Sequence, residues 1–211
     1  MSRFRAFFLS VYAFLAEMSE RDFMTYISLY CAVFFLTISV LIHFLQTELN
    51  PIAEPLSRYA VDGQYSFLMI SGFLAFGMSE LLLALLLDEA TLGAKLLFWV
   101  GIAMLLVGIF PMDIGQHHTW VGYIHTVAAT IQLMLFPCAT LMIAHSQPQG
   151  VLKIYSFLTG GMTLSFFILL VFAYFQASRF FGFIQKFDIF FITTWVVVVS
   201  ASQVSAPLGG K

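Results

Sequence analysis

The chain has 211 residues, of which 61% are apolar and only 9% are charged. Soluble domains contain about 45–50% apolar and about 25% charged residues, so water cannot be the solvent for most of this surface. The formal net charge of −2 provides no basic patch, which argues against nucleic acid as a partner and leaves membrane lipid as the expected one.

Residues 1–25 are predicted to form a separate N-terminal segment. Arg3 and Arg5 open it, and apolar residues then recur at helical spacing at Phe4, Phe7, Phe8, Val11 and Leu15. One apolar face beside a polar one predicts an amphipathic helix lying in the membrane interface. A signal peptide is the alternative, although cleavage after Ala16 would place Phe14 where a small residue is required.

Six later stretches are apolar and long enough to cross a hydrocarbon core of about 30 Å. The predicted helices are Tyr26–Thr47, Ser66–Leu87, Leu92–Met112, Trp120–His145, Leu152–Phe175 and Phe181–Val204. Turn-forming residues separate them, among them Asn50-Pro51, Gly115 and Gly150. The sequence therefore predicts an all-α, six-helix transmembrane domain over residues 26–205, followed by a flexible tail at 206–211.

The orientation is predicted from lysine and arginine, which favour cytoplasmic loops. A cytoplasmic N-terminus would place six of these residues inside, namely Arg3, Arg5, Arg21, Lys95, Lys153 and Lys211. Three would then lie outside, namely Arg58, Arg179 and Lys186. This excess predicts that both termini are cytoplasmic.

Polar residues that the six-helix order brings to the outer leaflet are the best indication of a functional site. His43, His125 and Asp188 lie near the outer ends of three different helices, and Asp113 lies in an outer loop. Histidine and carboxylate side chains can bind zinc or exchange protons, so we expect a metal site at His125, His43 and Asp188, or an acid–base site. The alternative is structural: each histidine bonds a neighbouring helix, while Asp188 pairs with Arg179 or Lys186.

Glu80 lies nearer the inner side, within the second helix. A carboxyl group inside the membrane could bind the proton of a transporter. A hydrogen bond from a nearby hydroxyl group or to a backbone carbonyl is the alternative.

The first outer loop and the junction before the fourth helix carry motifs that resemble a known family. Leu56-Ser57-Arg58-Tyr59 with Gly63, then Phe110-Pro111-Met112-Asp113, and finally Gly122 with His125, resemble the domain-of-unknown-function 998 (DUF998) family of multi-pass membrane proteins. The resemblance implies that Ser57, Asp113 and His125 are the candidate catalytic residues. Ser39 and His43 also resemble the SxxxH spacing of alkaline-ceramidase-type membrane hydrolases, but their paired HxxxH motif is absent, so a zinc site is not implied.

Three functions fit these features. A lipid-acting membrane hydrolase with its site in the outer leaflet would use the residues that share that depth. A non-catalytic subunit or assembly factor would pack its apolar faces against other membrane subunits. A proton-coupled transporter would use Glu80, although no inverted repeat accompanies it.

Overall fold

The structure is a computed structural model that describes residues 18–87, 90–115 and 118–204. Over these residues the chain forms six long helices, one short helix and no strand. The helices are α2 (Glu20–Leu45), α3 (Leu56–Tyr59), α4 (Ser66–Leu86), α5 (Leu92–Ile109), α6 (Trp120–Ser146), α7 (Val151–Phe175) and α8 (Phe181–Val204). The six long ones are long and apolar enough to cross a membrane, which confirms the predicted bundle. Of the predicted N-terminal segment over residues 1–25, residues 1–17 lie outside the described residues, and residues 20–25 form the start of α2.

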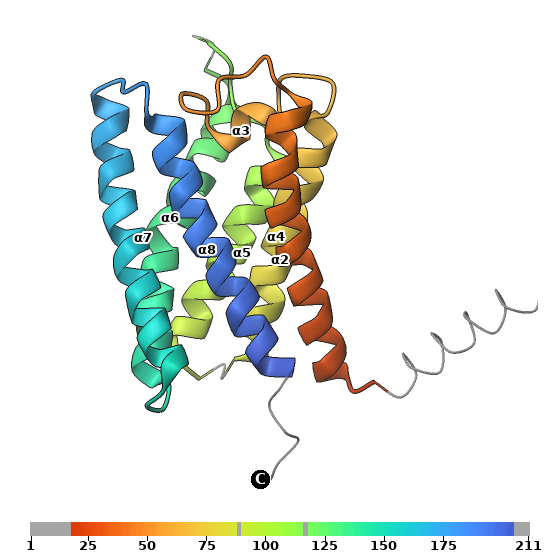
Figure 1. The fold of residues 1–211 in the computed structure, drawn as a ribbon, viewed down its shortest axis with the longest axis vertical. Coiled ribbons are helices and arrows are strands. Elements are labelled where there is room, and N and C mark those ends of the chain that lie inside the picture. The colour runs from red at the N-terminus through yellow and green to blue at the C-terminus, as the bar shows by residue number, and fades with distance from the viewer. Residues whose placement is uncertain (1–17, 88–89, 116–117, 205–211) are drawn as a thin grey trace, which may run out of the picture.

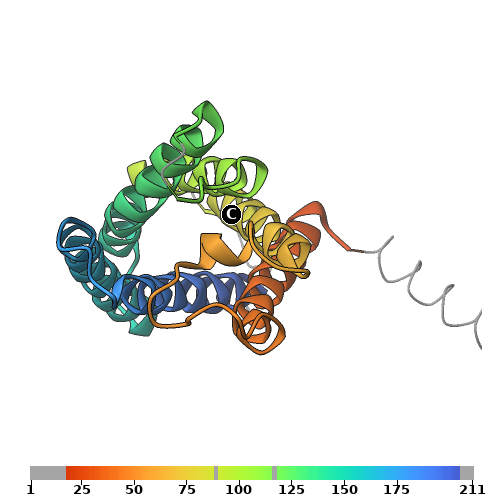
Figure 2. The same cartoon turned by 90° about the horizontal axis from the view of Figure 1, so that it is seen from above.

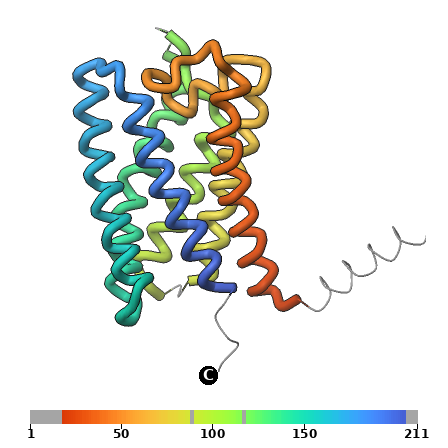
Figure 3. The backbone as a smooth tube through the Cα atoms, in the orientation of Figure 1, coloured from red at the N-terminus to blue at the C-terminus, as the bar shows by residue number. Residues whose placement is uncertain are grey.

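The six long helices form a closed ring. Each packs against two neighbours, in the order α2, α4, α5, α6, α7, α8 and back to α2, as the view along the bundle shows (Figure 2). The chain runs alternately up and down, so the start of α2 and the end of α8 lie at the same end, here called the terminal end (Figures 1 and 3). The loop over residues 46–65, which contains α3, lies at the opposite end, here called the cap end.

Two helix boundaries differ from the predicted ones. α2 begins at Glu20 instead of Tyr26, because the hydroxyl group of Ser19 accepts a hydrogen bond from the Asp22 N–H and caps the helix six residues earlier. α5 ends at Ile109 instead of Met112, since Phe110 precedes a proline and adopts the extended backbone that such a position favours.

Large aromatic side chains fill much of the ring. Phe35 of α2 stacks on Phe76 of α4 with ring centroids 4.6 Å apart. Trp195 of α8 is fully buried, meets Phe136 of α6 edge-on at 5.5 Å, and donates a 2.9 Å hydrogen bond to the hydroxyl group of Ser156 on α7. Three helices are thus joined around one side chain whose polar atom is satisfied.

Hydroxyl groups join α2, α4 and α8 toward the terminal end. The Ser28 hydroxyl lies 2.9 Å from that of Ser200 and 3.2 Å from that of Ser79, and Ser79 donates to the Ser28 carbonyl at 2.7 Å. All three serines are buried. Since lipid provides no hydrogen bonds, such contacts between helices help to hold the ring together.

The loop at the cap end is bound to the start of α8. The N–H groups of Gly182 and Phe183, which have no partner within a helix, donate to the carbonyls of Ala53 and Ile52. Gln185 accepts a 3.0 Å bond from the Leu56 N–H, and Lys186 donates to the Glu54 carbonyl. The loop therefore caps α8 and places α3 over the end of the ring.

The α4–α5 contact yields the first prediction. A Cβ atom at Gly101 would lie 2.8 Å from the backbone nitrogen of Leu81, whereas one at Gly161 on α7 would meet nothing within 4 Å. Gly101→Val should lower the free energy of unfolding by about 1–3 kcal/mol through overpacking, and the control Gly161→Val should not. Thermal unfolding in detergent measures this, and equal stability of the two variants would contradict the close packing.

Candidate functional site

His125 lies about five residues inside the cap end of α6 and is largely buried. Its Nδ1 atom is 2.7 Å from the carbonyl oxygen of Phe110, the residue that ends α5. The imidazole therefore satisfies a carbonyl group that the helix leaves without an intrahelical partner. This is the structural alternative named above for the histidines, and it joins α6 to the end of α5.

Asp113 organises the start of α6. Its carboxylate accepts bonds from the Thr119 N–H at 2.8 Å and from the Thr119 hydroxyl at 2.7 Å, and that hydroxyl in turn caps α6 by accepting from the Gly122 N–H. A side chain at position 122 would collide with the Asp113 carboxylate, so glycine is required there. Asp113, Thr119 and Gly122 thus form one hydrogen-bonded unit, and the negative charge of the Asp113 carboxylate lies near the N-terminus of α6. Asp113 and Gly122 are two of the residues that carry the family resemblance.

The other family motif forms the centre of the cap. Ser57 and Tyr59 of α3 are buried, while Arg58 pairs with Asp62 at 2.7 Å. Gly63 has a φ of +94°, a conformation that L side chains rarely adopt. The motif therefore specifies a compact loop, and it places Ser57 on α3 rather than in the hydrogen-bonded unit of Asp113.

His43 belongs to the cap-end part of α2 and faces the cap. Its ring lies 4.9 Å from that of Tyr59, and the ammonium group of Lys186 lies 5.3 Å from the centre of the same Tyr59 ring. Lys186 also donates 2.7 Å and 2.5 Å bonds to the Pro51 and Glu54 carbonyls. Two basic side chains from α2 and α8 thus meet on one tyrosine.

These two side chains also line a groove of about 330 Å³ between α2 and α8, here called the α2–α8 groove. Its lining residues are Leu36, Ser39, Val40, His43, Phe44, Leu56, Lys186, Ile189, Phe190 and Thr193. Val40, Phe44 and Phe190 are well exposed on the outer surface of the bundle, so the groove opens sideways, toward lipid. The Ser39 hydroxyl is buried and has no hydrogen-bond partner among the described residues.

Asp188 and Glu80 are fully buried in the ring, on α8 and α4. Within the described residues, neither oxygen of either carboxyl group has a hydrogen-bond partner. The expected pairing of Asp188 with Lys186 or Arg179 is wrong, because Lys186 binds carbonyls of the cap loop and Arg179 lies over Phe180. No hydroxyl group or backbone carbonyl among the described residues bonds Glu80, which has the Gln132 side chain as a polar neighbour.

The three residues considered as metal ligands come from three separate places. His125 bonds the end of α5, His43 lies against the cap, and Asp188 points into the ring. In the parts of the chain that the structure describes, no group of three or more His, Cys, Asp or Glu side chains could hold a metal ion. Zinc ligation by His125, His43 and Asp188 therefore gains no geometric support, and we do not propose zinc as a cofactor.

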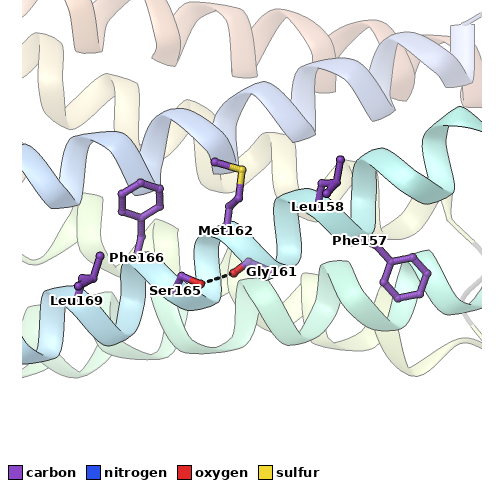
Figure 4. Close-up of a pocket in the computed structure, with 7 residues that line it drawn as sticks. All are labelled: Phe157, Leu158, Gly161, Met162, Ser165, Phe166 and Leu169. Carbon is purple, nitrogen blue, oxygen red and sulfur yellow. Dashed lines mark hydrogen bonds between the residues drawn. The ribbon is translucent and has the colours of Figure 1, made fainter.

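A second groove, of about 400 Å³, lies along α7 (Figure 4). Its residues are Phe157, Leu158, Gly161, Met162, Ser165, Phe166 and Leu169. The Ser165 hydroxyl donates a 2.9 Å bond to the Gly161 carbonyl within the same helix. The lining has no titratable group and no unpaired polar side chain, so this groove offers contact with apolar chains but no chemistry.

Sequence reasoning missed the role of Lys186. The sequence suggests a side chain that extends outward to water, because it lies near a helix end. Instead it binds two carbonyls of the loop over residues 46–65. No local pattern in the sequence shows the contact between α8 and that loop, so the sequence carried no signal for this role.

The first prediction for this region concerns Asp113. Asp113→Ala should lower the free energy of unfolding by about 1.5–3 kcal/mol, because it removes charge-assisted hydrogen bonds to Thr119. His118→Ala, in the same loop but exposed, is the control. Thermal unfolding in detergent distinguishes them, and an Asp113→Ala protein as stable as the control would show that the unit is not structural.

The second prediction concerns pH. Burial and the nearby Glu54 and Glu48 carboxylates raise the pKa of Tyr59 from 10 to about 12. Because the folded protein binds this proton more tightly, its stabilising contribution is complete below pH 10 and is lost as the pH rises toward 12. The unfolding temperature should fall over this range, and Tyr59→Phe should reduce the fall, whereas the control Tyr123→Phe should not. An equal fall of the unfolding temperature between pH 10 and pH 12 in the wild-type protein and both variants would contradict this prediction.

Comparison with known proteins agrees with these motifs. No curated protein and no solved structure matches the chain. A family model described as a protein of unknown function, DUF998, matches residues 29–202, which include every long helix in whole or large part as well as the cap loop. The chain is therefore a multi-pass membrane protein that belongs to the DUF998 family.

Proposed function

We propose that this protein binds a membrane phospholipid in the α2–α8 groove and acts on it there. The observation that carries the proposal is the composition of the groove, which has apolar walls along most of its length and basic side chains at its cap end. A phospholipid has the same division between apolar chains and a charged head group. The groove also opens toward lipid, so the ligand can enter from the bilayer.

The polar end of the groove suits a phosphate group. Lys186 provides an ammonium group that makes two hydrogen bonds to carbonyls and has a third donor left over. His43 and Ser39 lie one helical turn apart on the same face of α2 and both line the groove. A phosphate bound at this end would meet the Lys186 ammonium group, with the His43 imidazole and the Ser39 hydroxyl lining the groove beside it.

Hydrolysis of the bound lipid is the reaction that we propose. In the groove, the Ser39 hydroxyl can attack the carbonyl carbon of an acyl ester, with His43 as the base that takes its proton. The bond between that carbon and the glycerol oxygen then breaks, and His43 returns the proton to the leaving alcohol. Water then releases the acyl group from the serine. His125, Asp113 and Ser57 remain candidates for a second site at the cap end, although His125 and Asp113 already make strong structural bonds.

The groove is proposed to lie in the outer leaflet. This follows from the predicted cytoplasmic termini, because the cap end lies opposite the end where α2 starts and α8 ends. The described residues place three cations toward each end, namely Arg21, Lys95 and Lys153 toward the terminal end and Arg58, Arg179 and Lys186 toward the cap end. The proposed orientation therefore rests on Arg3, Arg5 and Lys211 of the sequence.

The test compares two tryptophan substitutions. Val40 lines the groove and Leu41 does not, yet both are neighbouring, exposed, apolar residues of α2. In nanodiscs that contain a photoactivatable phospholipid, Val40→Trp should reduce crosslinking to α2 and α8 by about tenfold, corresponding to about 1.4 kcal/mol of binding. Leu41→Trp should leave it unchanged.

A second arm tests the reaction in the same nanodiscs. Release of fatty acid from the phospholipid should fall in Val40→Trp and in His43→Gln, while His43→Gln retains most crosslinking. Equal crosslinking in Val40→Trp and Leu41→Trp would refute the binding site. Binding without release of fatty acid by the wild-type protein would refute hydrolysis alone.

A further inference from the structure

Glu80 lies in the ring interior, apart from the α2–α8 groove. It is fully buried on α4, about 14 residues from the cap end and six from the terminal end of that helix. Helical rise places it about 9 Å inside the terminal end of α4. Neither of its oxygens has a hydrogen-bond partner among the described residues.

The surroundings of Glu80 contain an amide but no positive charge. The Gln132 side chain of α6 lies close to the carboxyl group and is itself buried. No Lys, Arg or His side chain among the described residues forms an ion pair with Glu80. Ser79, the adjacent residue, bonds Ser28 instead, and Ser28 in turn bonds Ser200.

An ionised carboxylate in this position is strongly disfavoured, since the group is fully buried and forms no ion pair with a described side chain. A protonated carboxyl group costs much less and can donate its O–H to the Gln132 carbonyl oxygen. From this geometry we propose that Glu80 is a proton-binding site, which holds a proton in the closed ring and joins α4 to α6 through Gln132.

Loss of the proton requires that the charge be solvated. The shortest route to water runs toward the terminal end, which the Ser28–Ser79–Ser200 contacts close between α2, α4 and α8. Release of the proton therefore accompanies separation of these helices. Loss of the proton from the Glu80 carboxyl group is thereby coupled to opening of the ring at its terminal end.

Dicyclohexylcarbodiimide tests this directly, because it is apolar and reacts with protonated carboxyl groups in membranes. The full-length protein in nanodiscs at pH 8 is treated with the reagent, and labelled peptides are identified by mass spectrometry. Glu80 should be labelled, as should Asp188, which is equally buried and unpaired. Glu48, exposed in the cap loop, should remain unlabelled.

The control is Glu80→Gln, which has the same shape and resembles the neutral acid. It should fold with an unfolding temperature at least equal to that of the wild-type protein, and should retain labelling at Asp188. An unlabelled Glu80 beside a labelled Asp188 in the wild-type protein would overturn the proposal, whether or not the variant folds. So would protection of Glu80 by excess sodium or potassium, which would identify a cation site instead.

Discussion

The absence of water from the hydrocarbon core is the constraint on which this structure depends. Every buried polar atom must find its partner within the protein, and this requirement explains why the long elements are helices. It also explains the contacts at their ends. The Phe110 carbonyl bonds to His125, the first N–H groups of α8 bond to the cap loop, and Asp113 holds the start of α6.

Against this background, the polar atoms that remain unpaired are informative. Ser39 on α2, Asp188 on α8 and Glu80 on α4 have buried oxygens without partners among the described residues. Each such group costs free energy where it is buried without a partner. Such a cost is tolerated where a ligand, a proton or a conformational change satisfies the group. Ser39 is the position at which we propose a ligand, and Glu80 the position at which we propose a proton. His125 and Asp113, by contrast, make hydrogen bonds that build the fold.

The ring architecture separates two polar regions. The α2–α8 groove opens outward near the cap end and combines Lys186 and His43 with apolar walls. Glu80 faces inward, about two-thirds of the way toward the terminal end, beyond the stacked Phe35 and Phe76. A lipid in the groove would contact α2 and α8, two of the helices joined by the serine contacts near Glu80. The two regions thus share the helices whose separation would open the ring.

The sequence by itself determined the six membrane-spanning helices, because each needs only about 20 apolar residues and that pattern is local. Local chemistry also favours the end of α5 at Ile109, because Phe110 precedes a proline, although the predicted helix extended three residues further, to Met112. The depth of His43, His125 and Asp188 followed from counting along helices. The partners of these side chains could not be predicted in this way, since the rotation of each helix about its own axis depends on packing between helices. Only the tertiary structure decided that His125 bonds α5, that Lys186 binds the cap loop and that Asp188 faces the ring interior.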